Sequence, residues 1–191
     1  MTQLILGLGN PGGEYARTRH NVGWMCLDEL ERRGKFGRDR REDSTRVREG
    51  SIDGYDVLTA RPQTFMNLSG RAALKLTSRH ATAPRDVIVV HDEADFPLGK
   101  VKIKFGGSAA GHRGVQSLID SWHTDSFPRI RIGIGRSGES NDLIEHVLDP
   151  FHPDERAQVE AAVGRAASMA VAIMRDGVEA AMNVWNRAGS D

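Results

Sequence analysis

Apolar residues form short continuous runs at two places, and each run predicts a buried strand. The first run covers residues 3–8 and ends in glycines, which indicates a loop directly after it. The second run, residues 86–90 (DVIVV), is rich in β-branched residues, as is typical of a strand whose sheet is covered on both faces. We expect this second strand to stop at His91 and Asp92.

Polar and apolar residues alternate in further segments, which also predict strands. Residues 46–60 alternate around Asp53-Gly54, a favoured turn sequence, and predict two short strands paired as a hairpin. Residues 100–105 place three lysines on one face of a strand, and residues 129–135 place two arginines on one face of another. The side chains of the lysine-bearing strand that we expect in the core are Val101, Ile103 and Phe105.

Apolar residues recur every three or four positions in other segments, which predicts amphipathic helices. The predicted helices are residues 22–33, a helix through residues 72–76 that ends near 79, residues 115–121, a long helix from 153 onward, and a short helix at 178–185. Strands that alternate with helices indicate an α/β fold. We therefore predict a single domain over residues 1–191, with a central, mostly parallel mixed sheet flanked by helices.

Length and composition agree with one globular domain. The 191 residues match the usual size of a domain, and 39% hydrophobic with 27% charged residues can supply a core without favouring disorder. The single cysteine, Cys26, excludes an intrachain disulfide, and its apolar neighbours predict a core position. The first residues do not resemble a signal peptide, and no apolar run is long enough to cross a membrane, so we expect a cytoplasmic protein.

The net charge is zero, with 26 basic and 26 acidic residues, and gives no argument for a nucleic-acid partner. Basic residues are dense between residues 32 and 48, but Asp39, Glu42 and Asp43 interrupt them. We interpret this segment as an ordinary solvated face.

A glycine-rich motif follows the first predicted strand. Residues 7–12 (GLGNPG) match G-x-G-x-x-G, the fingerprint of a dinucleotide-binding turn. In that fingerprint the glycines open a helix directly, whereas residues 11–21 here delay the helix, and the acidic residue expected at the end of a second strand is missing. The motif instead predicts a ligand-binding loop that carries Asn10.

His20 lies in a polar loop before the first predicted helix, and Asp92 lies at the end of the strand predicted from residues 86–90. Strands of one parallel sheet bring their carboxyl ends to the same edge, so these two side chains can meet. A neutral imidazole can take a proton from water near neutral pH, and a carboxylate on its other nitrogen would fix the tautomer and stabilise the cation. Chance adjacency is the rival interpretation, because the chain has seven histidines and many carboxylates.

Residues 61–70 place Phe65 and Met66 between polar residues at a strand-to-helix junction. These two side chains are either packing residues or the apolar floor of a binding site, and Asn67 is either a helix cap or a ligand contact. The chain has no H-E-x-x-H, paired C-x-x-C, G-x-S-x-G or P-loop motif, which disfavours zinc hydrolases, serine esterases and P-loop enzymes.

Taken together, these motifs resemble the bacterial peptidyl-tRNA hydrolase family. The resemblance covers roughly the first 135 residues, in family order. Its blocks are residues 7–12 with Tyr15, residues 18–21 (TRHN), residues 63–70 (QTFMNLSG), residues 91–93 (HDE), residues 106–117 and residues 131–135 (RIGIG).

The resemblance implies a monomeric esterase that cleaves peptidyl-tRNA at its acceptor end, with His20 as general base and Asp92 as its orienting residue. It implies no metal and no organic cofactor. Asn10 is implied in catalysis, and the implied substrate-binding residues are Tyr15, Phe65, Met66, Asn67, His112 and Arg113. The positions matching the family's grip on the tRNA 5′-phosphate are Lys102, Lys104 and Arg131.

One position departs from the family pattern. This chain reads Gly-His-Arg-Gly at residues 111–114, where the family usually has asparagine in place of Arg113. Arginine can steady an oxyanion or a phosphate but cannot accept a hydrogen bond from water. Because a related subgroup has lost hydrolase activity and serves RNA processing, a non-catalytic RNA-binding member is the second hypothesis. A nucleotide-dependent oxidoreductase built on the glycine loop is the third.

Overall fold

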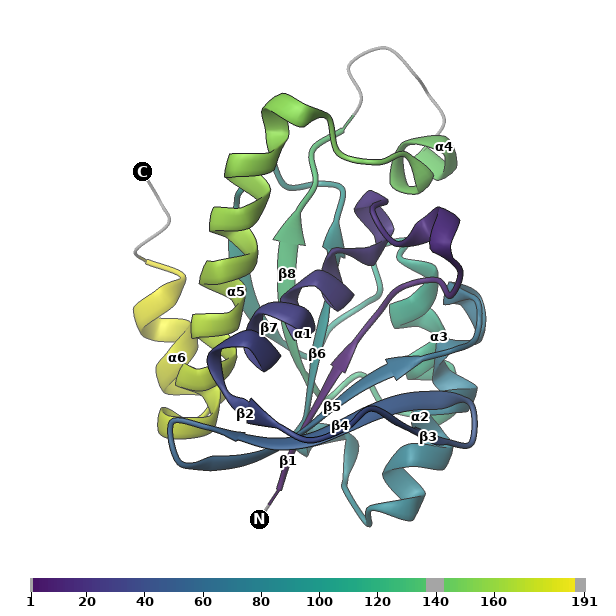
Figure 1. Ribbon diagram of the computed structural model, residues 1–191, viewed down its shortest axis with the longest axis vertical. Coiled ribbons are helices and arrows are strands. Elements are labelled where there is room, and N and C mark those ends of the chain that lie inside the picture. The colour runs from purple at the N-terminus through teal and green to yellow at the C-terminus, as the bar shows by residue number, and fades with distance from the viewer. Residues whose placement is uncertain (1, 137–142, 188–191) are drawn as a thin grey trace.

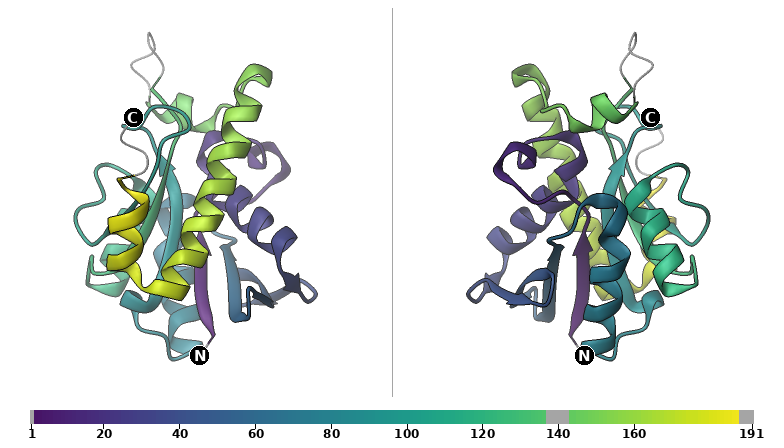
Figure 2. Two further views of the ribbon diagram at one scale, coloured as in Figure 1. Left: turned by 90° about the vertical axis from the view of Figure 1, so that its left-hand side faces the viewer. Right: turned by 90° about the vertical axis from the view of Figure 1, so that its right-hand side faces the viewer.

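The computed structural model describes residues 2–136 and 143–187, which form a mixed sheet with helices on both faces (Figures 1 and 2). The strands are β1 (Gln3–Gly7), β2 (Lys35–Phe36), β3 (Arg40–Glu42), β4 (Thr45–Ile52), β5 (Tyr55–Pro62), β6 (Val87–Glu93), β7 (Val101–Phe105) and β8 (Pro128–Gly133). The helices are α1 (Val22–Arg33), α2 (Ser69–Arg79), α3 (Arg113–Trp122), α4 (Leu143–Leu148), α5 (Arg156–Asp176) and α6 (Val178–Trp185).

The strand order is β2-β4-β5-β1-β6-β8-β7, with β3 paired to β4 outside this path. The central strands β5, β1, β6 and β8 are parallel, whereas the strands outside them pair antiparallel. The fold class predicted from the sequence is confirmed. The predicted hairpin is also present, and its turn residues Asp53 and Gly54 have positive φ angles of 50° and 86°.

Each face of the sheet contributes to its own apolar core. Ile88 and Val90 of β6 pack with α1, α5 and α6, whereas Val87 and Val89 pack with α2 and α3. This arrangement explains why residues 87–90 of β6 are continuously apolar. Cys26 is fully buried in the first core, and burial raises the pKa of its thiol to about 12, so it is an unreactive core residue as predicted.

Two sequence predictions about strand ends are wrong. Strand β6 does not stop at His91-Asp92 but continues to Glu93, because Asp92 and Glu93 still pair with β8. Phe105 does not enter the core: it is 42% exposed, because it forms the last pair of β7 with β8, beyond the core side chains that bury Val101 and Ile103. Helix α3 also begins two residues earlier than predicted, at Arg113.

Candidate active site

The site lies where the parallel strands β1 and β6 end side by side. Strand β1 leads into the glycine loop, and the chain then makes two 3-10 turns, Gly13–Tyr15 and Arg19–Asn21, before α1 begins. The glycines therefore do not open a helix, and the prediction from the sequence that the helix is delayed is confirmed. The dinucleotide-binding interpretation consequently loses its structural basis. His20 lies in the second turn, directly beside the end of β6.

His20 and Asp92 meet at this edge of the sheet. Nδ1 of His20 lies 2.9 Å from both carboxylate oxygens of Asp92, and both residues are buried. Burial would raise the pKa of Asp92, but the neighbouring His20 and His112 imidazoles and their hydrogen bonds lower it well below its usual value. Asp92 is therefore an ionised acceptor that engages Nδ1 of His20, so Nε2 is the ring nitrogen of this cavity-lining residue that is left for a ligand.

Asn10 connects the glycine loop to the segment before α2. Its Oδ1 accepts a hydrogen bond of 2.7 Å from the backbone N–H of Met66. Asn21 fixes the Asn10 backbone from the other side, because its side chain accepts from the Asn10 N–H at 2.8 Å and donates to the Asn10 carbonyl at 2.9 Å. Oδ1 of Asn10 is therefore engaged, and its Nδ2, which has no acceptor within residues 2–136 and 143–187, remains as a donor.

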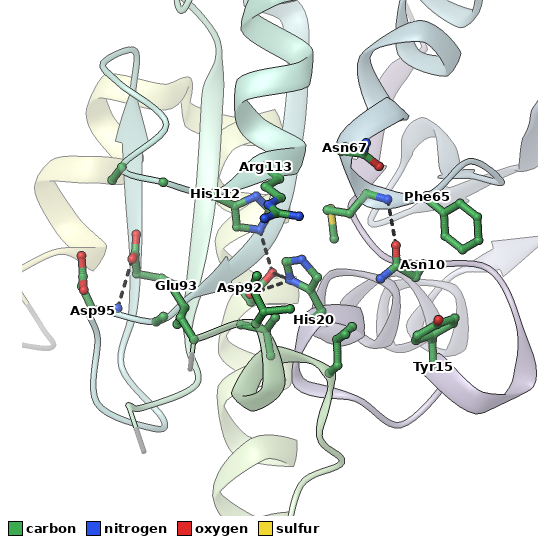
Figure 3. Close-up of a pocket in the computed structure, with 18 of the residues that line it drawn as sticks. Asn10, Tyr15, His20, Phe65, Asn67, Asp92, Glu93, Asp95, His112 and Arg113 are labelled. Atoms are coloured by element: carbon green, nitrogen blue, oxygen red, sulfur yellow. Dashed lines mark hydrogen bonds and ion pairs between the residues drawn. The ribbon is translucent and has the colours of Figure 1, made fainter. Parts of the chain in front are cut away.

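A cavity of about 480 Å³ opens in front of His20. Figure 3 shows Tyr15 and Phe65 on one side of it, with His20, Asp92 and His112 at its centre. Phe65 is 58% exposed, so it is not a packing residue, whereas Met66 is buried in the second core and also lines the cavity. Asn67 does not cap α2, whose N-cap residue is Leu68, so it is available to a ligand.

Helix α4 supplies an apolar wall of this cavity that the sequence reading missed. Its lining side chains are Leu143, Ile144, Val147 and Leu148. The helix has only six residues, too few for a helical period to be recognised. Its exposed leucines would otherwise be an unexplained apolar surface; facing a cavity, they suit an apolar part of a ligand.

His112 and Arg113 lie at the start of α3 and line the cavity. Nε2 of His112 lies 2.8 Å from Oδ1 of Asp92, so a second histidine contacts the carboxylate, a contact that sequence reasoning did not foresee. Arg113 is exposed, and within residues 2–136 and 143–187 its guanidinium has no ion-pair partner.

Comparisons with known proteins point to one family. A sequence profile described as peptidyl-tRNA hydrolase matches residues 4–191. The peptidyl-tRNA hydrolase of Thermodesulfovibrio yellowstonii is 45% identical over 96% of this chain and 98% of its own, and that of Chloroflexus aurantiacus is 43% identical over the same shares. The chain belongs to the peptidyl-tRNA hydrolase family.

A solved structure shares this fold. The crystal structure of peptidyl-tRNA hydrolase from Acinetobacter baumannii superposes with a TM-score of 0.89 at 33% identity, covering 97% of this chain and 94% of that chain. The family match extends through the C-terminal helices, beyond the first 135 residues that carried the sequence resemblance. In the described ranges, no helix is long and apolar enough to cross a membrane.

The basic residues that the family resemblance pointed to share one face of the sheet. The antiparallel register places Lys102 opposite Arg131 and Lys104 opposite Arg129. Arg131 is held by Glu93 at 2.9 Å, and Lys102 donates to the Asn186 carbonyl at 3.3 Å. Lys104 has no such partner among the described residues.

Arg129 has a structural role that sequence reasoning missed. Its side chain is buried and donates to the carbonyls of Gly106, Gly107 and Ser108. These bonds hold the glycine-rich loop that leads to His112. Burial, and then the cations of Arg129 and Arg131, lower the pKa of the Lys104 ammonium, so an anion at this position would relieve the crowding of positive charge.

His20, Asp92 and His112 also form the one group of potential metal ligands found in the described ranges, with ligand atoms within 4.8 Å of one another. The sequence predicted a pairing of Asp92 with His20 alone, and the structure adds His112 to this group. The ring nitrogens nearest Asp92 are at hydrogen-bond distance from it, so a metal bound through them would have to displace both hydrogen bonds.

Proposed function

We propose that this protein hydrolyses the ester bond between a peptide, or an N-blocked amino acid, and the 3′-terminal ribose of tRNA. The hydrolysis would recycle tRNA from prematurely released peptidyl-tRNA. The observation that carries the proposal is the buried His20–Asp92 pair, at 2.9 Å, on the wall of a cavity in a peptidyl-tRNA hydrolase fold.

In the proposed mechanism, His20 is the general base and Asp92 orients it. Nδ1–H of His20 donates to Asp92, so Nε2 is free to take a proton from water as the water oxygen attacks the ester carbonyl. The tetrahedral oxyanion then collapses and breaks the bond to the ribose oxygen. His20 returns its proton to that oxygen, giving a tRNA with a free hydroxyl and a peptide with a free carboxyl group.

The remaining cavity residues suit the two sides of the substrate. Nδ2 of Asn10 and the guanidinium of Arg113 are donors for the developing oxyanion, and Arg113 would take this role where the family usually has asparagine. Tyr15, Phe65, Met66 and Asn67 would contact the peptide and the terminal ribose, beside the apolar wall of α4. No step needs a metal or an organic cofactor.

The proposed partner is the acceptor end of peptidyl-tRNA, with the 5′-phosphate held by Lys102, Lys104 and Arg131. Phosphate contacts of this kind position a nucleic acid without reading its bases. We propose that residues 1–191 act as one catalytic unit, as a monomer, in the cytoplasm where translation supplies the substrate.

The test separates an enzyme from a non-catalytic RNA-binding relative. Purified protein is incubated with N-blocked aminoacyl-tRNA, and both release of the blocked amino acid and binding of the tRNA are measured. Release with turnover is expected, because the base, its orienting carboxylate and the cavity are all present. Binding without release would favour the RNA-binding hypothesis and reject the proposed function.

A further inference from the structure

His112 occupies an unusual position at the start of α3. It is the N-cap residue, a place usually taken by serine, threonine, aspartate or asparagine. Its Nδ1 accepts hydrogen bonds from the backbone N–H groups of Gly114, at 3.1 Å, and Val115, at 3.2 Å. The imidazole thus satisfies two of the N–H groups that a helix leaves without partners at its first turn.

These two bonds decide which nitrogen of His112 carries the proton. In a neutral imidazole one nitrogen donates and the other accepts. Because Nδ1 accepts two N–H groups, the proton lies on Nε2, and Nε2 donates to Oδ1 of Asp92 at 2.8 Å. A proton on Nδ1 would face two N–H groups and the positive end of the helix, so the tautomer with its proton on Nε2 is the one that fits this geometry.

Asp92 consequently lies between two imidazole donors. His20 donates from one side and His112 from the other, with ring centroids 5.1 Å apart. A buried carboxylate needs such partners, and Asp92 is only 2% exposed. His91 packs against His112 with ring centroids 4.8 Å apart, and burial holds the pKa of His91 well below its usual value. His91 is therefore a neutral support behind this contact.

We infer that His112 is a positioning residue, held by the start of helix α3 in the tautomer that donates to Asp92. It fixes the carboxylate in the orientation that His20 needs, and it does not bind the substrate. The effect that we expect on kcat rests on the proposed function, whereas the tautomer of His112 does not. It replaces the substrate-binding role that the family resemblance implied for His112.

Two variants separate the two ends of the imidazole. In His112→Asn the short amide can accept hydrogen bonds from the Gly114 and Val115 N–H groups but does not reach Asp92. In His112→Gln the longer amide can donate to Asp92 but does not cap the helix. We expect His112→Asn to fold like the wild type and to lose about tenfold or more in kcat, less than the loss expected for removing a general base. His112→Gln should keep more of kcat than His112→Asn although it is less stable to urea.

The split between kcat and KM distinguishes positioning from substrate binding, with N-blocked aminoacyl-tRNA as the substrate. KM should stay within about twofold of the wild type in His112→Asn, since a residue that acts through Asp92 makes no ground-state contact with the substrate. A raised KM with unchanged kcat would overturn the inference. The opposite ranking, with His112→Asn active and His112→Gln inactive, would reduce His112 to a helix cap and overturn it as well.

A measurement on the wild type does not depend on activity. Nitrogen-15 NMR of the histidine rings distinguishes the two neutral tautomers and the cation. For His112 we expect the proton on Nε2 and none on Nδ1, because Nδ1 accepts two backbone N–H groups; a proton on Nδ1 would contradict the inference. If the wild type hydrolysed no substrate, the proposed function would fail while this measurement would still decide the tautomer.

Discussion

At the scale of single residues, the meeting of His20 with Asp92 was predictable and the contact of His112 with Asp92 was not. The first follows from strand order, because β1 and β6 are parallel neighbours whose carboxyl ends share one edge. The second depends on the loop before α3, where Ala110 and Gly111 have positive φ angles of 47° and 82°. No periodic pattern gives the direction of such a loop, so the sequence could not place His112.

Asn10 allows a residue-scale prediction, because its two amide atoms have different tasks. Asn10→Asp keeps an acceptor for the Met66 N–H but has no donor for an oxyanion. We expect it to fold like the wild type and to lose about 10²- to 10³-fold in kcat, the usual cost of removing such a donor. Asn10→Ala should lose both catalysis and stability, as measured by the midpoint of urea denaturation. Full activity in Asn10→Asp would mean that Asn10 does not contact the reacting atoms.

The second residue-scale prediction concerns metal ions. Asp92 is already satisfied by two imidazoles, and the proposed mechanism needs no Lewis acid. Prolonged treatment with EDTA, followed by removal of the chelator, should leave kcat unchanged. Activity that disappears with EDTA and returns with zinc would show that His20, Asp92 and His112 form a metal site instead.

At the scale of elements, the longer helices follow from their hydrophobic period, and the strands of the central sheet follow from continuous apolar runs or from alternation. The elements that the pattern missed are the short ones, β2, β3 and α4, which have two, three and six residues. A strand of two or three residues shows too few alternations, and a helix of six residues too few turns, for a hydrophobic pattern to be recognised. Tertiary contacts therefore decide these elements. The sequence also could not show that α2 and α3 pack together.

Gly70 carries the prediction about this helix pair. A Cβ atom at Gly70 would lie 1.9 Å from the backbone oxygen of Ser117, so α2 and α3 can approach only with glycine at this position. Gly70→Ala should lower the free energy of unfolding by about 1–3 kcal/mol through overpacking, and should lower activity because α3 carries His112 and Arg113. Gly13→Ala is the matched control, since a Cβ there meets no atom within 4 Å. Equal denaturation midpoints for the two variants would refute the packing argument.

At the scale of the whole molecule, charge distribution matters more than net charge. The chain has no net charge, yet Lys102, Lys104, Arg129 and Arg131 share one face of β7 and β8. The alternation in the sequence predicted this face but not that Arg129 would be buried and would donate to the carbonyls of Gly106, Gly107 and Ser108. Of these four basic residues, Lys104 is therefore the best candidate for a phosphate contact.

We predict that Lys104→Ala raises KM for full-length substrate about tenfold with little change in kcat, because a loss of about 1.4 kcal/mol in binding is a factor of ten. The effect should shrink as salt rises, and a minimal substrate without the 5′-phosphate should not distinguish the variant from the wild type. Lys75→Ala, at an exposed lysine on α2, is the control. Wild-type behaviour of Lys104→Ala on both substrates would remove the phosphate contact and leave the chemistry of His20 untouched.

The central claim is that His20 is the base that activates water, and the most direct test is the single-turnover rate of N-blocked aminoacyl-tRNA hydrolysis by His20→Ala. The control is His123→Asn, at an exposed histidine outside the cavity whose left-handed backbone asparagine tolerates. The account predicts a rate about 10²- to 10⁴-fold below the wild type for His20→Ala, with tRNA binding and folding retained, and a wild-type rate for His123→Asn. A His20→Ala protein that hydrolyses the substrate at nearly the wild-type rate would contradict it.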